Sequence, residues 1–159
     1  MTAPDLSAQF APQFGLGDID QISFAVRNLD EAVPRYEAMF GGPFATMDVP
    51  DMDVVVRGRP SVTSLRLGFG QSAGLEVELV EVVAGDWPTL TWLDEHGEGL
   101  HHIRYPVSDA AAPRAALEAA GAKVVLEGGG EGYAFVYLEA PHLNGMVIEL
   151  LQMGTAPQS

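Results

Sequence analysis

Two adjacent histidines stand in the stretch GLHHIRYPV, residues 99–107, and an arginine follows them. Successive side chains of an extended strand point to opposite faces, so only one of the two histidines can share a face with Arg104. That residue is His102, and His101 is then expected to pack on the helix-covered side with a satisfied hydrogen bond. Cysteine is absent, which leaves imidazoles, carboxylates and amides as metal ligands. The pattern therefore favours His102 as the histidine that does chemistry.

A repeat in the sequence gives His102 a counterpart. Residues 19–41 align with residues 100–122 at a constant offset of 81, which matches Gln21 with His102. In each copy, alternating apolar residues are followed by a helical pattern that ends at glycine. Each copy therefore predicts a strand followed by a helix.

A second pair of aligned segments adds two carboxylates. LEVELVE, residues 75–81, matches MVIELLQ, residues 146–152, and pairs Glu78 with Glu149. The period of two sends the larger apolar residues of these strands to the helix side and leaves the polar ones on the opposite face. Four donors are thus predicted on one open face: Gln21, Glu78, His102 and Glu149.

One imidazole, two carboxylates and one amide oxygen suit a divalent ion such as Zn, Ni, Co, Mn or Fe. Two carboxylates held close together repel each other, and a dication removes that repulsion. The alternative is that each residue is an ordinary solvated side chain on the surface of a sheet. Their matching positions in the repeat favour a metal site.

The elements that carry these donors form two copies of one unit. In each copy a strand and a helix are followed by three more strand patterns, which predicts an α+β fold of two tandem βαβββ modules. The first copy has about ten extra residues near 49–60, between strands expected at 43–49 and 62–69. The predicted organisation is a flexible N-terminus at 1–16, a module at 17–86, a linker helix at 87–98, a second module at 99–152 and a flexible tail at 153–159.

Charge narrows the choice of partners. The 159 residues include 22 acidic and 8 basic side chains, a formal net charge of −14, which repels nucleic acid and anionic membrane surfaces. No apolar run approaches the roughly 20 residues of a membrane span, and the N-terminal residues lack a secretory signal pattern. These observations predict a cytoplasmic protein with a small-molecule ligand and with no nucleic-acid or membrane partner.

The motifs DQISFAV, VELVEV, GLHHIRYPV and GMVIELLQ resemble those of the vicinal oxygen chelate superfamily over residues 17–152. HGEGLHHI, followed about 45 residues later by GMVIEL, is most similar to the glyoxalase and methylmalonyl-CoA epimerase branch. The resemblance implies a cup-shaped mixed β-sheet with helices on its outer face, a homodimer, and a divalent metal ion as cofactor. It also implies that the metal ligands are Gln21, Glu78, His102 and Glu149.

The resemblance further implies an enzyme that transfers a proton next to a carbonyl group through a metal-stabilised enolate, as an epimerase, an isomerase or a glyoxalase-type lyase. Glu149 is favoured as the catalytic base, and Glu78 is the alternative. The second acid/base glutamate of the epimerases has no clear counterpart, because residues 47–60 offer only aspartates. Two other functions stay open: a metal-free small-molecule binding protein of the bleomycin-resistance type, and a tailoring enzyme for a secondary metabolite.

Arginines are the candidates for substrate binding. Arg104 lies on the face of His102 and is expected to pair with a carboxylate or phosphate of the substrate. The alternative is a structural ion pair with a glutamate on a neighbouring strand. Three further arginines, Arg57, Arg59 and Arg66, are expected at the pocket rim or in a solvated loop. An anionic small molecule is therefore one expected class of substrate.

Overall fold

The computed structural model describes residues 14–154, and this part of the chain forms one closed eight-stranded sheet with three α-helices. In chain order the elements are β1 (Gln21–Ala25), α1 (Leu29–Phe40), β2 (Ala45–Val56), β3 (Arg59–Ser72), β4 (Leu75–Ala84), α2 (Pro88–His96), β5 (Gly99–Val107), α3 (Ala111–Ala119), β6 (Lys123–Gly130), β7 (Tyr133–Ala140), the short 3-10 helix η1 (Pro141–Leu143) and β8 (Met146–Met153).

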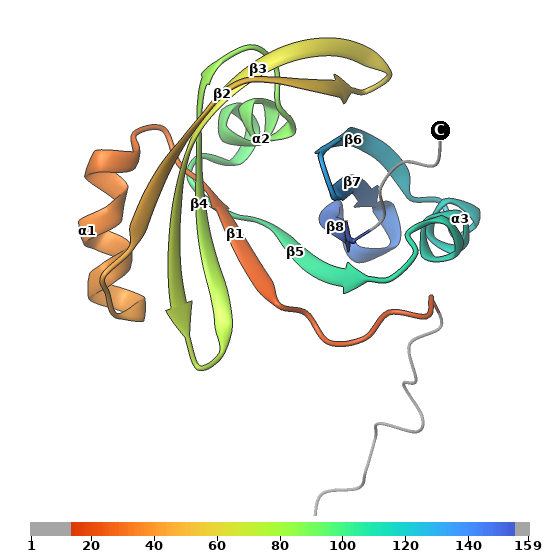
Figure 1. The fold of residues 1–159 in the computed structure, drawn as a ribbon, viewed down its shortest axis with the longest axis horizontal. Helices are drawn as coiled ribbons and strands as arrows, with labels where there is room; N and C mark the ends of the chain where they lie inside the picture. The colour runs from red at the N-terminus through yellow and green to blue at the C-terminus, as the bar shows by residue number, and fades with distance from the viewer. Residues whose placement is uncertain (1–13, 155–159) are drawn as a thin grey trace, which may run out of the picture.

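The order of the strands confirms the duplicated α+β architecture. The sheet closes in the order β1-β4-β3-β2-β6-β7-β8-β5, so each module supplies four consecutive strands of the cup. The first and last strands of each module run parallel, β1 with β4 and β5 with β8, while β1 and β5 meet antiparallel between the two modules (Figure 1). The four strands that carry the predicted donors are therefore neighbours, in the order β4, β1, β5 and β8.

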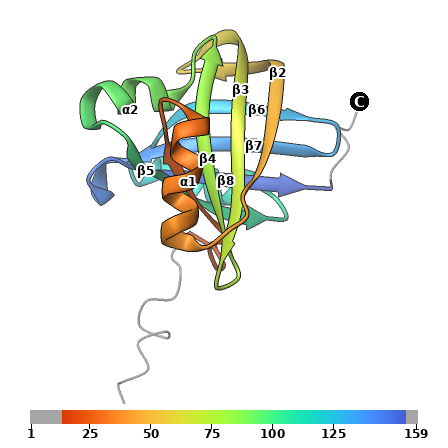
Figure 2. The ribbon, with the colours of Figure 1, turned by 90° about the vertical axis from the view of Figure 1, so that its left-hand side faces the viewer.

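Helices cover the outside of the cup, and their packing decides which side chains point inward. Figure 2 shows α1 in front of the sheet of the first module, where it contacts β3 and β4. The Asn28 side chain accepts a hydrogen bond from the backbone N–H of Glu31 and so caps the start of this helix. Beneath the helix, the ring of Phe24 packs edge-on against Tyr36. Phe24 faces α1, and Gln21 lies three residues earlier in the same strand, so its side chain points to the opposite, inner side of β1. Gln21 is fully buried there.

The extra residues of the first module form strand rather than a connecting loop. β2 continues to Val56, and the chain turns at Arg57 and Gly58, both with positive φ, into β3. The valine-rich end of β2 alternates between inner and outer positions, and its inner residues Val54 and Val56 are buried. Val54 pairs with Gly128 of β6, which closes the sheet. The insertion therefore joins the two modules on the side away from β1 and β5.

Both ends of the described chain contribute to packing. Leu16, which the sequence places in the N-terminal tail, is buried in a cluster with Leu117 and Ile148. At the other end β8 extends to Met153, one residue past the predicted module. The predicted flexibility of residues 1–13 and 155–159 concerns positions outside the described residues. Within the described part, no helix combines the length and apolar character needed to cross a membrane.

Candidate functional site

A β-bulge brings the imidazoles of His101 and His102 into contact. β1 pairs Ser23 with His102 but Phe24 with Leu100, so His101 is an extra residue on β5. The strict alternation predicted for this stretch is therefore wrong at this point. His101 is buried as predicted, but its Nδ1 lies 2.9 Å from Nδ1 of His102. The bulge therefore places the ring of His101 in contact with His102, a predicted metal ligand.

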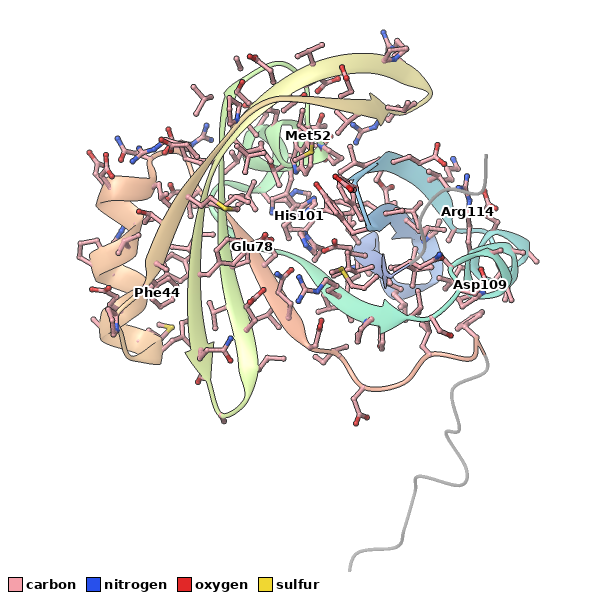
Figure 3. All side chains as sticks on the ribbon, in the orientation of Figure 1. Phe44, Met52, Glu78, His101, Asp109 and Arg114 are labelled. Atoms are coloured by element: carbon pink, nitrogen blue, oxygen red, sulfur yellow. The ribbon has the colours of Figure 1, made fainter. Side chains whose placement is uncertain are left out.

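His102 lies inside the cup next to two carboxylates. Its side chain is fully buried, and its Nε2 is 3.1 Å from Glu149 Oε2 and 3.8 Å from Glu78 Oε2. Figure 3 shows Glu78 and His101 in the interior, between the two halves of the sheet. Donor atoms bound to a tetrahedral ion at about 2.0–2.1 Å lie about 3.3 Å from one another. The separations of 3.1 and 3.8 Å bracket that spacing.

The amide of Gln21 carries an unsatisfied oxygen. Its Nε2 donates to Glu76 Oε1 at 2.7 Å, and because an ionised carboxylate only accepts, this bond fixes which end of the amide is nitrogen. Oε1 is buried and has no hydrogen-bond partner among the described residues. Leaving a buried acceptor unpaired costs about 1–3 kcal/mol. A cation beside Oε1 would remove this cost.

The predicted metal donors lie near one another, but their side chains do not converge on one ion position. In the described part of the chain, no trio of His, Asp or Glu side chains is arranged around one ion position. Glu149 contacts His102 instead, and Glu78 accepts a hydrogen bond of 2.6 Å from Ser23 Oγ. Gln21 lies two residues from Ser23 on the same face, diagonal to His102. The donor types and the orphaned amide oxygen fit a divalent ion, with these donors drawn together around it.

Burial controls protonation in the site. It raises the pKa of the Glu78 carboxyl to about 7; His102 opposes this rise, the Glu149 carboxylate adds to it, and the Ser23 hydrogen bond lowers it. Burial, with smaller contributions from His102 and Arg57, lowers the pKa of His101 to about 2, so its ring is neutral. The site therefore holds a carboxyl group that keeps its proton well above the usual range of a glutamate.

A cavity of about 470 Å³ opens onto the carboxylates of the site. Glu78 and Glu149 line it, whereas His102 and Gln21 have no exposed surface. Substrate in the cavity could therefore touch the carboxylates first. The rest of the lining is mostly apolar, and its aromatic part consists of Trp87, Tyr133, Phe135 and Tyr137.

Arg104 lies beside the donor set, and acidic neighbours hold its guanidinium. Nε and Nη2 donate to the two Asp20 carboxylate oxygens at 2.8 and 3.1 Å, and Nη2 lies 3.4 Å from Glu76 Oε1. Burial lowers the pKa of Arg104, but its acidic neighbours outweigh this and keep the pKa above its ordinary value. Arg104 is thus held in an ion pair, as in the predicted alternative, but its bidentate partner is Asp20 rather than a glutamate. The longer contact with Glu76 links Arg104 to the amide of Gln21.

The other three arginines are separated from one another. Arg66 is paired with Asp30 at 2.8 Å beside helix α1. Arg57, at the turn between β2 and β3, lines a smaller cavity of about 160 Å³. Arg59 is exposed on β3. Arg57, Arg59 and Arg66 therefore do not form a common patch at the rim of the larger cavity, so the first of the two alternatives predicted for them is wrong.

Four further residues belong to the site that the sequence reading did not select. Ser23 and Glu76 hydrogen-bond to the donor residues, and both lie on the predicted open face, so a search for partners of the buried donors would have found them. Tyr137 lies opposite Glu149 in the pairing of β7 with β8, with its ring centre 4.5 Å from that of His102. Predicting Tyr137 as a site residue requires the pairing register of β7 with β8, and predicting His101 requires knowledge of the bulge in β5.

Comparison with known proteins assigns this arrangement to a family. The model of the glyoxalase/bleomycin resistance protein/dioxygenase superfamily matches residues 20–137. The chain belongs to this superfamily. The match confirms the resemblance seen in the sequence motifs and agrees with the two βαβββ modules of the structure.

Relatives of this superfamily member include epimerases. The chain is 28% identical over 144 residues to the ethylmalonyl-CoA/methylmalonyl-CoA epimerase of Cereibacter sphaeroides, covering 87% of this chain and 99% of the relative. Its fold is similar to that of methylmalonyl-CoA epimerase from Mycobacterium tuberculosis, with a TM-score of 0.61 and 19% identity over 98% of this chain and 94% of that one. A methylmalonyl-CoA epimerase solved with methylmalonyl-CoA and NH4+ gives a TM-score of 0.58 and 25% identity, covering 91% of this chain and 99% of the other.

Proposed function

We propose that this superfamily member is a divalent-metal-dependent enzyme that transfers a proton on the carbon next to a carbonyl group, as an epimerase, an isomerase or a lyase. The observation that carries the proposal is the buried Oε1 of Gln21, which has no hydrogen-bond partner in the described part of the chain. It lies on the same inner face as His102 and two carboxylates that line a cavity. The coenzyme A epimerases among its relatives support a reaction of this type.

The donor residues divide by their exposure. Gln21 and His102 have no exposed surface and are proposed as fixed ligands. Glu78 and Glu149 both line the cavity and can reach a substrate as well as an ion. A divalent ion bound by these four residues would act as a Lewis acid toward negative charge developing on a substrate oxygen.

Glu149 is the proposed base. Ser23 holds the Glu78 carboxylate through a hydrogen bond of 2.6 Å, whereas the contact of Glu149 Oε2 is to Nε2 of His102. Glu149 is thus the carboxylate that can turn toward the substrate and take the proton from the acidic carbon. Tyr137, opposite Glu149, stays protonated because burial raises the pKa of its phenol well above the usual value.

The rest of the lining supports a reaction with one base. Among the described residues that line the cavity, the remaining carboxylate is that of Asp48, which is 82% exposed and lies 3.4 Å from Arg66. A solvated, paired aspartate at the rim is poorly placed to take up a proton inside the cavity. The proposed second step is therefore return of the proton by Glu149 to a different position of the enolate. In an isomerase or a lyase it goes to the neighbouring carbon, and in an epimerase it goes to the opposite face of the same carbon after the intermediate has turned, because return to the original face would regenerate the substrate.

Proton exchange in D2O tests this proposal. Carbonyl compounds, methylmalonyl-CoA included, are incubated with the protein and loss of the proton next to the carbonyl is followed by NMR, while elemental analysis reports bound metal. Glu149→Gln is expected to keep a stoichiometric metal and to slow exchange by at least about 100-fold. The exposed Glu131→Gln is the matched control and should change neither quantity.

Two outcomes would contradict the proposal. Full exchange by Glu149→Gln with its metal bound would exclude Glu149 as the base. Native protein that neither contains nor takes up a transition metal, yet binds apolar small molecules tightly, would indicate a binding protein of the bleomycin-resistance type.

A further inference from the structure

We infer that the group that enters the cavity is neutral and apolar, so that the site takes uncharged carbonyl compounds, aromatic ones included, rather than carboxylates. The inference rests on the proposed metal-dependent proton transfer and names the substrate class of that site. Three features carry it: the charge balance of the donor set, the absence of a counter-ion among the described lining residues, and the aromatic wall of the cavity.

The charges of the donor set cancel those of a divalent ion. Glu78 and Glu149 supply two negative charges, and the Gln21 amide and a neutral His102 imidazole supply none. Two carboxylates therefore compensate a dication completely. A substrate carboxylate would add an uncompensated negative charge to a site in which both glutamates are more than nine-tenths buried, and burying such a charge is strongly unfavourable.

Among the described residues that line it, the cavity has no cationic side chain to offset that charge. None of the described residues that line it is Lys or Arg. Besides Glu78 and Glu149, the charged side chain among them is the carboxylate of Asp48. Arg104 and Arg66 lie outside the lining, and each is already paired, with Asp20 and Asp30 respectively. An anion in the cavity would therefore face carboxylates and apolar surface.

The shape and chemistry of the walls suit a planar apolar group. Trp87, Phe135 and Tyr137 form an aromatic wall with ring centres 5.9–6.0 Å apart. Leu65 and Leu67 add aliphatic surface. Aromatic walls bind planar apolar groups through buried area and ring contacts, and the volume of about 470 Å³ is in the range of small-molecule sites. Malonyl groups, which occur in the names of the relatives, carry a free carboxylate and lack such a surface.

Two dyes that share one ring system test the inference. N-phenyl-1-naphthylamine is neutral, and 8-anilinonaphthalene-1-sulfonate adds a negative charge to the same rings. Both are titrated by fluorescence into the full chain, with Zn²⁺ and after removal of metal by EDTA. We expect saturable binding of the neutral dye and at least about tenfold weaker binding of the sulfonate.

A variant that introduces a positive charge separates the effect of charge from that of general hydrophobicity. Leu151 lines the cavity and is half-buried, so a lysine at this position can keep its ammonium group near water. Leu151→Lys is expected to shift the affinity ratio toward the sulfonate by about tenfold, and Leu151→Met should leave the ratio unchanged. Met47→Lys, at an exposed lining position, gives the same readout if the first variant does not fold.

The outcomes distinguish this inference from the proposed reaction. Equal affinity of the native protein for both dyes, or no saturable binding of the neutral dye, overturns the inference even when zinc is bound. Discrimination between the dyes without any uptake of zinc supports a cavity for neutral ligands and contradicts the metal-dependent reaction.

Discussion

Nδ1 of His101 lies 2.9 Å from Nδ1 of His102, although neighbours in a strand normally point to opposite faces. When Nε2 of a histidine faces a metal ion, its Nδ1 carries the proton and needs an acceptor. His101 offers that acceptor, because its buried ring is neutral and has one unprotonated nitrogen. For the proposed metal site, His101 is therefore expected to act as a positioning residue that fixes the tautomer and orientation of His102.

Loss of this acceptor is expected to weaken metal binding. His101→Phe keeps a ring against Trp92 but removes the acceptor, and should lower zinc affinity about 10–100-fold. His101→Asn places an amide oxygen near the position of Nδ1 and should recover most of the affinity. Competition with a chromophoric chelator measures both variants. Equal zinc affinities for the Phe and Asn variants would exclude a role for the hydrogen bond.

Substitution of Gln21 is expected to affect metal binding more strongly than the stability of the metal-free protein. Gln21→Leu removes a buried oxygen that has no partner among the described residues, but it also removes the Nε2 donor to Glu76. The two effects oppose each other, so unfolding by urea in EDTA should show a change in stability of less than about 2 kcal/mol. Zinc affinity should fall by more than about tenfold, because one proposed ligand is lost. Gln71→Leu, at an exposed position of β3, is the control for both measurements. A loss of stability well above the cost of the lost Glu76 hydrogen bond would mean that the oxygen is satisfied in the folded protein.

The repeat explains why much of the fold and donor set could be predicted. A constant offset places Gln21 opposite His102 in the two copies, and the strands that carry all four donors are indeed adjacent. The bulge at His101 escaped prediction because one extra residue changes the pairing of a strand without changing its composition. The glycine run at residues 128–130 is typical of a loop, yet these residues belong to β6, where the ring of Phe135 covers Gly128.

The pKa of Glu78 predicts how the stability of the metal-free protein depends on pH. This carboxyl has a pKa of 4.5 ordinarily and about 7 in the folded chain. Between these values the folded protein keeps a proton that the unfolded chain has released. The contribution of Glu78 to stability is therefore fully present below about pH 4.5 and is lost as pH rises through about 7. Glu78→Gln should flatten this part of the profile, measured by urea unfolding in EDTA from pH 4.5 to 8. An unchanged slope in that variant would assign the titration to another group.

Ser23 is expected to set the pH at which the site takes up metal. Its hydroxyl donates to Glu78 Oε2 and lowers the pKa of that carboxyl. Ser23→Ala should raise this pKa further and move the midpoint of zinc uptake to higher pH, because the ion binds the deprotonated carboxylate. Ser23→Thr keeps the hydroxyl and should titrate like the native protein. A midpoint that stays in place or moves to lower pH in Ser23→Ala would contradict this assignment.

Gly128 is expected to control the width of the cavity, because it leaves room for the ring of Phe135, which lines the cavity. A Cβ atom at this position would lie 2.4 Å from Cζ of Phe135 and 3.0 Å from Cγ1 of Val54, so a side chain has no room on this part of β6. Gly128→Val should therefore destabilise the protein by about 1–3 kcal/mol and push the ring of Phe135 into the cavity. Binding of the neutral dye should weaken in parallel.

Two further variants make the test of Gly128 specific. Gly17→Ala, where an added Cβ meets no atom within 4 Å, should leave stability and dye binding unchanged. Combining Gly128→Val with Phe135→Leu removes the ring that clashes, and part of the lost stability should return, because residues in contact are coupled. Strictly additive losses in the double variant would show that the ring of Phe135 is not what requires glycine at position 128.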